Sequence, residues 1–124
     1  MSFTLTTPPG TVPWQYTTPG NTGWSNTTAA VLAAANTGLI NYLSGFEYQN
    51  IGSTNTVFCI LDGANTILTG YITGNTYAPM TSVQLPNPIK GTVNNAMSVI
   101  FLSANSGANI FFNAQGFTGG GPNG

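Results

Sequence analysis

The chain has 124 residues, of which 41% are hydrophobic and only 2% are charged. Its only base is Lys90, its only acids are Glu47 and Asp62, and it contains no histidine. This composition predicts one domain with a real core, and it excludes nucleic-acid binding through a basic surface, electrostatic attachment to a membrane, and chemistry that depends on histidine. We therefore expect no cofactor and no metal, and a surface that associates readily with other protein chains.

Residues 1–26 are rich in proline, glycine and threonine. The stretch TPPGTVPWQYTTPGNTGW (7–24) has four prolines, which exclude a helix and a central strand, yet it carries Trp14, Tyr16 and Trp24. We predict an extended N-terminal arm whose aromatic residues bind a different chain, because stiff segments lose little entropy on docking and such residues often anchor interfaces. The alternative is that the arm folds back and buries its tryptophans against its own domain.

Residues 27–118 contain the periodic apolar segments of a predicted β-sandwich. The alanines of TTAAVLAAANTG (27–38) are compatible with a helix, but we favour a strand because strands follow it. The next segment, INYLSGFEYQN, alternates, which predicts that Tyr42, Ser44, Phe46 and Tyr48 share one face of a strand.

The segment TVFCILD (56–62) is apolar on both faces, which predicts a central strand covered on both sides. Obligate interfaces between subunits are more hydrophobic than ordinary protein surface. We therefore predict that Val57, Phe58, Ile60 and Leu61 contribute to an interface between copies of the chain.

Turn residues separate the remaining segments. The sequence DGAN (62–65) predicts a hairpin, Pro86 and Pro88 predict an extended crossing, and NSGA (105–108) predicts a second turn. Further strands are predicted from TILTGYI, MTSVQL, MSVIFLS and NIFFNAQGF. A series of about seven or eight short strands is typical of an all-β, jelly-roll-like antiparallel β-sandwich. Residues 119–124, GGGPNG, are expected to form a Gly-rich tail.

Candidate catalytic groups are few. Glu47 and Asp62 could form the carboxylate pair of a glycosidase, but a glycine follows Asp62 at a turn and Glu47 lies on a polar strand face, so we assign both structural roles. Cys59 lies between apolar residues and has no histidine to activate it, which predicts an inert, buried side chain. Lys90 is assigned to a solvated loop. We predict that the protein is not an enzyme.

Four stretches between residues 39 and 118 follow a recognisable order. They are GFEYQN (45–50), TVFCILDG (56–63), LPNPIKGT (85–92) followed by AMSVIFLS (96–103), and NIFFNAQGF (109–117). The first is an aromatic strand ending in Asn, and the second is an apolar strand closed by Asp-Gly. The third is a proline-flanked strand entering a Lys-Gly-Thr loop, and the last strand ends in Asn-Ala-Gln-Gly-Phe. This order resembles the decoration (cement, or head auxiliary) proteins of tailed-bacteriophage capsids.

The resemblance implies a non-enzymatic virion structural protein. Such proteins are jelly-roll-like sandwiches, usually trimeric, that bind the major capsid protein on the outer capsid surface and often hold it with an N-terminal arm. It therefore implies synthesis in the host cytoplasm and location on the virion surface. The near absence of charge departs from the family. The alternative is a carbohydrate- or receptor-binding module of a tail fibre or baseplate, with sugars bound by asparagines and by Tyr42, Tyr48, Tyr71 and Tyr77.

Overall fold

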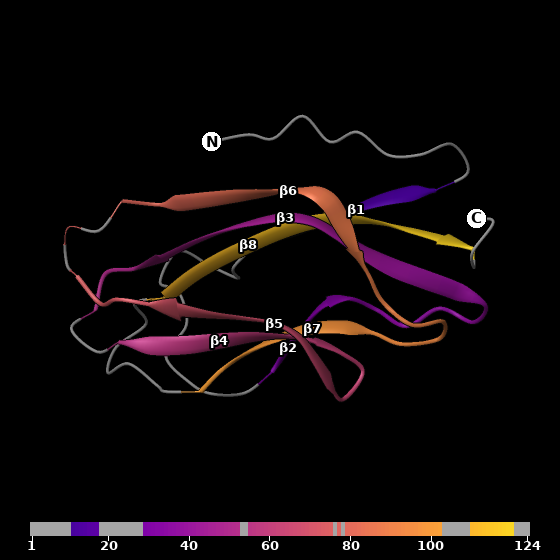
Figure 1. Cartoon of the computed structure of the whole chain (residues 1–124), viewed down its shortest axis with the longest axis horizontal. Coiled ribbons are helices and arrows are strands. Elements are labelled where there is room, and N and C mark those ends of the chain that lie inside the picture. The colour runs from indigo at the N-terminus through magenta and orange to yellow at the C-terminus, as the bar shows by residue number, and fades with distance from the viewer. Residues whose placement is uncertain are drawn as a thin grey trace.

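The fold consists of two packed β-sheets. The computed structural model describes residues 11–17, 29–52, 55–75, 77, 79–102 and 110–120. Within these ranges there are eight strands, which form two antiparallel four-stranded sheets seen as stacked layers in Figure 1. The strands are β1 (Val12–Tyr16), β2 (Ala30–Ala33), β3 (Leu39–Asn50), β4 (Thr56–Asp62), β5 (Asn65–Ile72), β6 (Thr81–Lys90), β7 (Met97–Phe101) and β8 (Ile110–Gly120).

The order of the strands is that of a jelly roll. Sheet A has the order β1-β8-β3-β6, and sheet B has the order β2-β7-β4-β5. The first strand pairs with the last, the second with the seventh, the third with the sixth and the fourth with the fifth, as in one long hairpin wrapped around a core. This nested pairing confirms the predicted fold class. Residues 30–33 form a strand, as favoured from the sequence.

The tip of the nested hairpin is the turn predicted at residues 62–65. Asp62 pairs with Asn65, and the chain reverses through Gly63 and Ala64. Gly63 has a φ of 60°, a left-handed value that favours glycine, and glycine at the first position of a two-residue loop is typical of a type II′ turn. The second predicted turn, at 105–108, lies outside the described residues.

The prolines of the strands lie at the sheet edges. Pro13 is in β1, and Pro86 and Pro88 are in β6, the two edge strands of sheet A. An edge strand can place its missing N–H on the side that has no neighbour. The pairing of β6 with β3 is interrupted between Gln84 and Ile89, so the predicted crossing is an edge strand with an irregular centre.

Aromatic rings fill the space between the sheets. The ring of Phe112 lies 5.8 Å from that of Phe46, 5.4 Å from that of Phe58 and 6.0 Å from that of Phe101, so one cluster joins four strands. Ring separations in this range are favourable for tilted and offset pairs. Gly70 of β5 lies directly under Phe58, and a Cβ atom at that position would collide with the ring.

A bulge in β3 changes which of its side chains face the core. The register of β3 with both neighbours shifts between Leu43 and Gly45. A bulge adds one residue to one strand and so reverses the alternation beyond it. Leu43 and Phe46 both belong to the core, and Tyr42 instead stacks on Phe117 with the ring centroids 4.6 Å apart. The prediction that Tyr42 and Phe46 share a face is therefore wrong.

The last strand is longer than the sequence suggested. Gly119 pairs with Ile40 and Gly120 pairs with Leu39, so both glycines belong to β8 and not to a tail. Glycine has no side chain to oppose this pairing, and the partner strand supplies the apolar contacts. Residues 121–124 lie outside the described residues.

One buried amide ties together several segments at one end of the sandwich. The side-chain nitrogen of Asn41 donates to the carbonyl groups of Ala33 (3.3 Å), Ala34 (3.0 Å) and Asn95 (3.2 Å), and its oxygen accepts from the Thr118 hydroxyl at 2.6 Å. Asn41 is only 3% exposed. It therefore joins β3 to β8, to the end of β2 in the other sheet, and to the connection between β6 and β7.

Replacing Asn41 with alanine is expected to lower the free energy of unfolding by about 2–4 kcal/mol, because buried polar groups lose their partners. Urea unfolding measures this loss. Asn36→Ala is the matched control, since Asn36 is exposed and its side chain makes a long hydrogen bond, 3.4 Å, to the Ala34 carbonyl. We expect that control to cost about 0.5 kcal/mol or less. Equal losses in the two variants would contradict the role given to Asn41.

Candidate functional site

Part of the expected N-terminal arm belongs to the sandwich. Residues Val12–Tyr16 form β1, which pairs with β8 at the edge of sheet A. Trp14 and Tyr16 pack against the core from this edge. The domain boundary expected at residue 26 is therefore corrected, because strand pairing orders residues 12–16 despite their turn-rich surroundings. The third predicted anchor, Trp24, lies outside the described residues.

Trp14 occupies space that a glycine leaves open. It is the register partner of Gly116, and a Cβ atom there would lie 2.5 Å from Cζ2 of the indole. The indole nitrogen is buried without a hydrogen-bond partner among the described residues. Burial also raises the pKa of the Tyr16 phenol. The two aromatic residues thus lie partly inside their own protomer, and no described residue accepts a hydrogen bond from the indole N–H.

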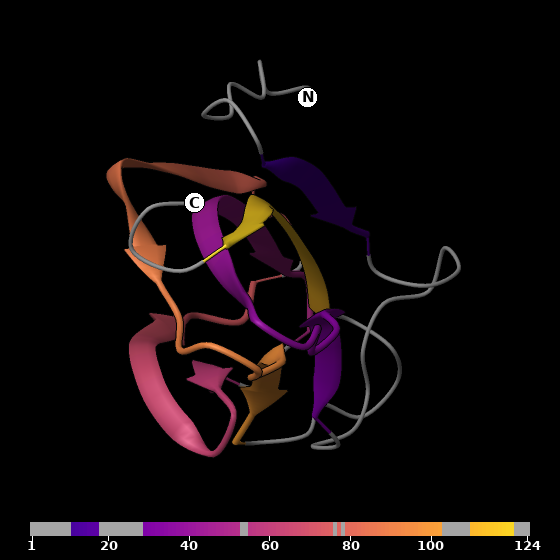
Figure 2. The same cartoon turned by 90° about the vertical axis from the view of Figure 1, so that its right-hand side faces the viewer.

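A cleft of about 400 Å³ opens beside Trp14. It lies between β1 and β2, edge strands of the two sheets that run on the same side of the sandwich (Figure 2). Val12 and Leu39 are 68% and 37% exposed there. None of the lining residues is charged; they are Val12, Pro13, Trp14, Leu32, Ala33, Ala34, Asn36, Leu39 and Thr118. We call this the edge cleft.

The predicted subunit-interface residues lie on two different faces of β4. Phe58 and Ile60 are 2% and 0% exposed and belong to the core of the protomer, so they are not available to a neighbouring copy and that part of the prediction is corrected. Strand alternation places Val57 and Leu61 on the opposite, outer face, where they are half-buried. For these two residues the interface stays a prediction.

Val57 and Leu61 are part of a wider apolar surface on sheet B. Tyr71 of β5 pairs with Val57 of β4, and Leu102 donates its N–H to the Val57 carbonyl at 2.8 Å. Tyr71, Leu102 and Val31 are 62%, 58% and 55% exposed. We call this surface the outer apolar face; it consists of Val31, Val57, Leu61, Tyr71, Ile100 and Leu102.

Cys59 lies between Val57 and Leu61 on the same strand face but is only 8% exposed. Its sulfur accepts a long hydrogen bond, 3.9 Å, from the Thr69 hydroxyl of the adjacent strand. The expectation of a buried cysteine is confirmed.

The two acids are held in separate hydrogen-bond networks. Glu47 in β3 accepts from Ser82 at 3.3 Å and from Asn113 at 2.9 Å, its neighbours on both sides in sheet A. Asp62, at the end of β4 in sheet B, accepts from both the N–H and the hydroxyl of Thr92. Both acids are buried, and the structure does not bring them together as a glycosidase pair.

Neither a metal cluster nor a membrane-spanning helix is found in the described ranges. Among these residues, no three side chains of His, Cys, Asp or Glu gather closely enough to hold a metal ion. The same ranges contain no helix with the length and apolar character needed to cross a membrane.

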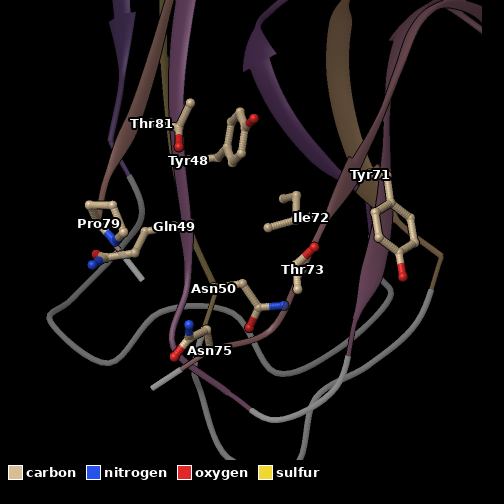
Figure 3. A pocket seen from close by; sticks show the side chains of 9 residues that line it. All are labelled: Tyr48, Gln49, Asn50, Tyr71, Ile72, Thr73, Asn75, Pro79 and Thr81. Carbon is tan, nitrogen blue, oxygen red and sulfur yellow. The ribbon is translucent and has the colours of Figure 1, made fainter. Parts of the chain in front are cut away.

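A second pocket, of about 290 Å³, lies at the end of the sandwich remote from Asn41. Figure 3 shows its lining, which comes from the ends of β3 and β5, the segment after β5, and the start of β6. Two of the four tyrosines predicted as a sugar platform line it, whereas Tyr42 lies beyond the bulge. We call it the end pocket; its lining residues are Tyr48, Gln49, Asn50, Tyr71, Ile72, Thr73, Asn75, Pro79 and Thr81.

Comparison with known proteins gives two solved structures and no family. No family model matches this chain. No curated protein matches it either. The structure of the Tobacco streak virus coat protein dimer is 11% identical, with a TM-score of 0.47, and the match covers 96% of this chain and 92% of that chain. A second crystal form of the same coat protein is 9% identical, with a TM-score of 0.40 and the same coverage. The jelly-roll assignment rests on the nested strand order and not on these likenesses.

Trp14→Ala is expected to lower the free energy of unfolding by about 2 kcal/mol, because a half-buried indole leaves the edge of the core. Gln15→Ala is the control, since Gln15 is exposed in the same strand and should cost about 0.5 kcal/mol or less. Chemical denaturation followed by circular dichroism measures both. Unchanged stability of Trp14→Ala would mean that residues 12–16 are not part of the folded domain.

Proposed function

We propose that the protein is a capsid decoration protein, a non-enzymatic component that binds the outer surface of a major capsid protein lattice and stabilises the shell. The supporting observation is a jelly roll with exposed apolar surfaces and almost no charge. Jelly rolls serve as capsid, lectin and cupin domains. Cupin chemistry uses histidine ligands for a metal, and this chain has no histidine. The resemblance of residues 39–118 to decoration proteins points in the same direction.

The edge cleft is the surface proposed to bind the shell. It is apolar and uncharged, and the buried Trp14 N–H beside it has no acceptor in the part of the chain that the structure describes, so a carbonyl group of a partner could supply one. The edge strand β1 also presents backbone groups on its outer side, to which an extended segment of a capsid protein can add. Trp24, which follows β1 in the sequence, remains a predicted anchor for the same partner.

The outer apolar face is proposed as the contact between copies, in a trimer. Its exposed members Val31, Tyr71 and Leu102 form a surface of the kind that subunit interfaces bury. A trimer would present three edge cleft surfaces to the lattice at once. Linked sites multiply weak affinities, so modest contacts at each cleft would hold the protein on the shell.

Val12→Asp is expected to weaken shell binding by about tenfold or more, because it places an unpaired charge in an apolar contact. Cosedimentation measures this binding, with shells of the same virus from which this protein has been removed. Met80→Asp is the matched control, since Met80 is also exposed and apolar but precedes β6 at the other end of the sandwich. Failure of the wild-type protein to bind these shells would overturn the proposal; equal binding by both variants would move the contact elsewhere.

Leu61→Asp is expected to convert the trimer to a monomer, as measured by size-exclusion chromatography with light scattering. Gln15→Asp adds the same charge to an exposed position of sheet A and should leave the mass unchanged. Molar salt should not dissociate the wild-type trimer, since Lys90 is the only base and little of the contact can be ionic. A monomeric wild-type protein would contradict this interface.

A further inference from the structure

The end pocket has features of a ligand site that shell binding does not require. We propose that it binds a neutral saccharide, one pyranose unit of an uncharged glycan. This inference goes beyond the proposed function and does not depend on it, because the end pocket lies at the end of the sandwich opposite the edge cleft.

The size and position of the pocket fit one sugar ring. Its volume of about 290 Å³ is close to the lower end, roughly 300 Å³, of small-molecule sites. In Figure 3, Tyr48 and Asn50 of β3 point into the space between the two sheets, and Ile72 at the end of β5 and Thr73 just after it approach the same space. The pocket is therefore bounded on two sides by strands, which hold side chains more rigidly than loops do.

The chemistry of the lining selects for hydroxyl groups. Gln49 and Asn75 supply amides, and Thr73 and Thr81 supply hydroxyls, so both donors and acceptors line the space. Sugar hydroxyls likewise both donate and accept.

The lining also selects against charged ligands, because none of its residues is charged. Lys90, the only base of the chain, lies at the opposite end of β6 from Thr81. A phosphate or an acidic sugar would find no counter-charge here, so the pocket favours neutral glycans.

Tyr48 supplies the apolar surface that a sugar ring contacts. It is held in place by Phe46 and Phe58, with ring centroids 6.2 Å and 5.7 Å away, so the inner wall is rigid before a ligand arrives. Tyrosine suits this role because it combines an apolar ring with a polar hydroxyl. Tyr71 lies only at the margin, on the other side of β5 (Figure 3).

The far wall of the pocket is fastened by backbone hydrogen bonds. The Asn50 carbonyl accepts from the Asn75 N–H at 3.0 Å, and the Asn50 side chain accepts from the Gly52 N–H at 3.1 Å. The Asn75 side-chain oxygen in turn accepts from the Tyr77 N–H at 3.0 Å. These bonds fix the position of Asn75 relative to β3, so the pocket is formed in the free protein.

Titration of the full chain with methyl glycosides of glucose, galactose, mannose and N-acetylglucosamine, followed by NMR, tests the proposal. At least one neutral sugar should shift the amide signals of residues 48–50 and 71–75. Thr73→Ala should then weaken binding about fivefold, the usual effect of one lost hydrogen bond. Thr66→Ala is the matched control, since Thr66 is also an exposed threonine but lies at the hairpin end of β5, away from the pocket.

The proposal is overturned if none of the sugars causes shifts at saturating concentration, or if the shifted signals lie away from the pocket. It is also overturned if Thr73→Ala and Thr66→Ala bind equally, or if sialic acid binds more tightly than every neutral sugar. Shell binding by Thr73→Ala should equal that of the wild type, so failure of the saccharide site and failure of the decoration function give different results.

Discussion

The structure depends on closing a sandwich with neutral hydrogen bonds. A chain with one base and two acids cannot use ion pairs to join its connections, and the amide of Asn41 does this at one end by contacting both sheets. Neutral hydrogen bonds act over short distances and require good geometry, so they order the groups that make them. The carboxyl group of Asp62 also accepts from neutral donors, the N–H and the hydroxyl of Thr92. At this end the two sheets are therefore joined without ion pairs among the described residues.

The proposed activities occupy three separate surfaces. The edge cleft lies on the side formed by β1 and β2, the outer apolar face lies on sheet B, and the end pocket lies beyond the last residues of β3 and β5. Because these surfaces do not overlap except at Tyr71, a protein held on a shell can keep the pocket open to solvent. The jelly roll thus permits attachment and ligand binding in one small domain.

Much of the fold follows from local sequence signals. The hairpin at Gly63 follows from turn chemistry, and proline chemistry correctly excludes a central strand at Pro13. The pairing of β1 could not, because its partner lies at the other end of the chain and VPWQY has no clear alternation.

The bulge in β3 and the assignment of the two faces of β4 could not be predicted from the sequence either. The alternation of INYLSGFEYQN continues through Ser44 with no sign of an extra residue, and a strand that is apolar on both faces does not reveal which face holds Phe58 and Ile60. The end pocket is only partly predictable, because only the fold shows that Tyr48 faces it, that Tyr71 lies at its margin and that Tyr42 stacks on Phe117 instead.

The pairing of β1 with β8 has a mechanical consequence. Val12 lies beside Thr118, so the described chain begins and finishes at the same corner of the sandwich. A load pulling these two ends apart would break the backbone hydrogen bonds between β1 and β8 one after another, at low force. The aromatic core between the sheets would stay intact.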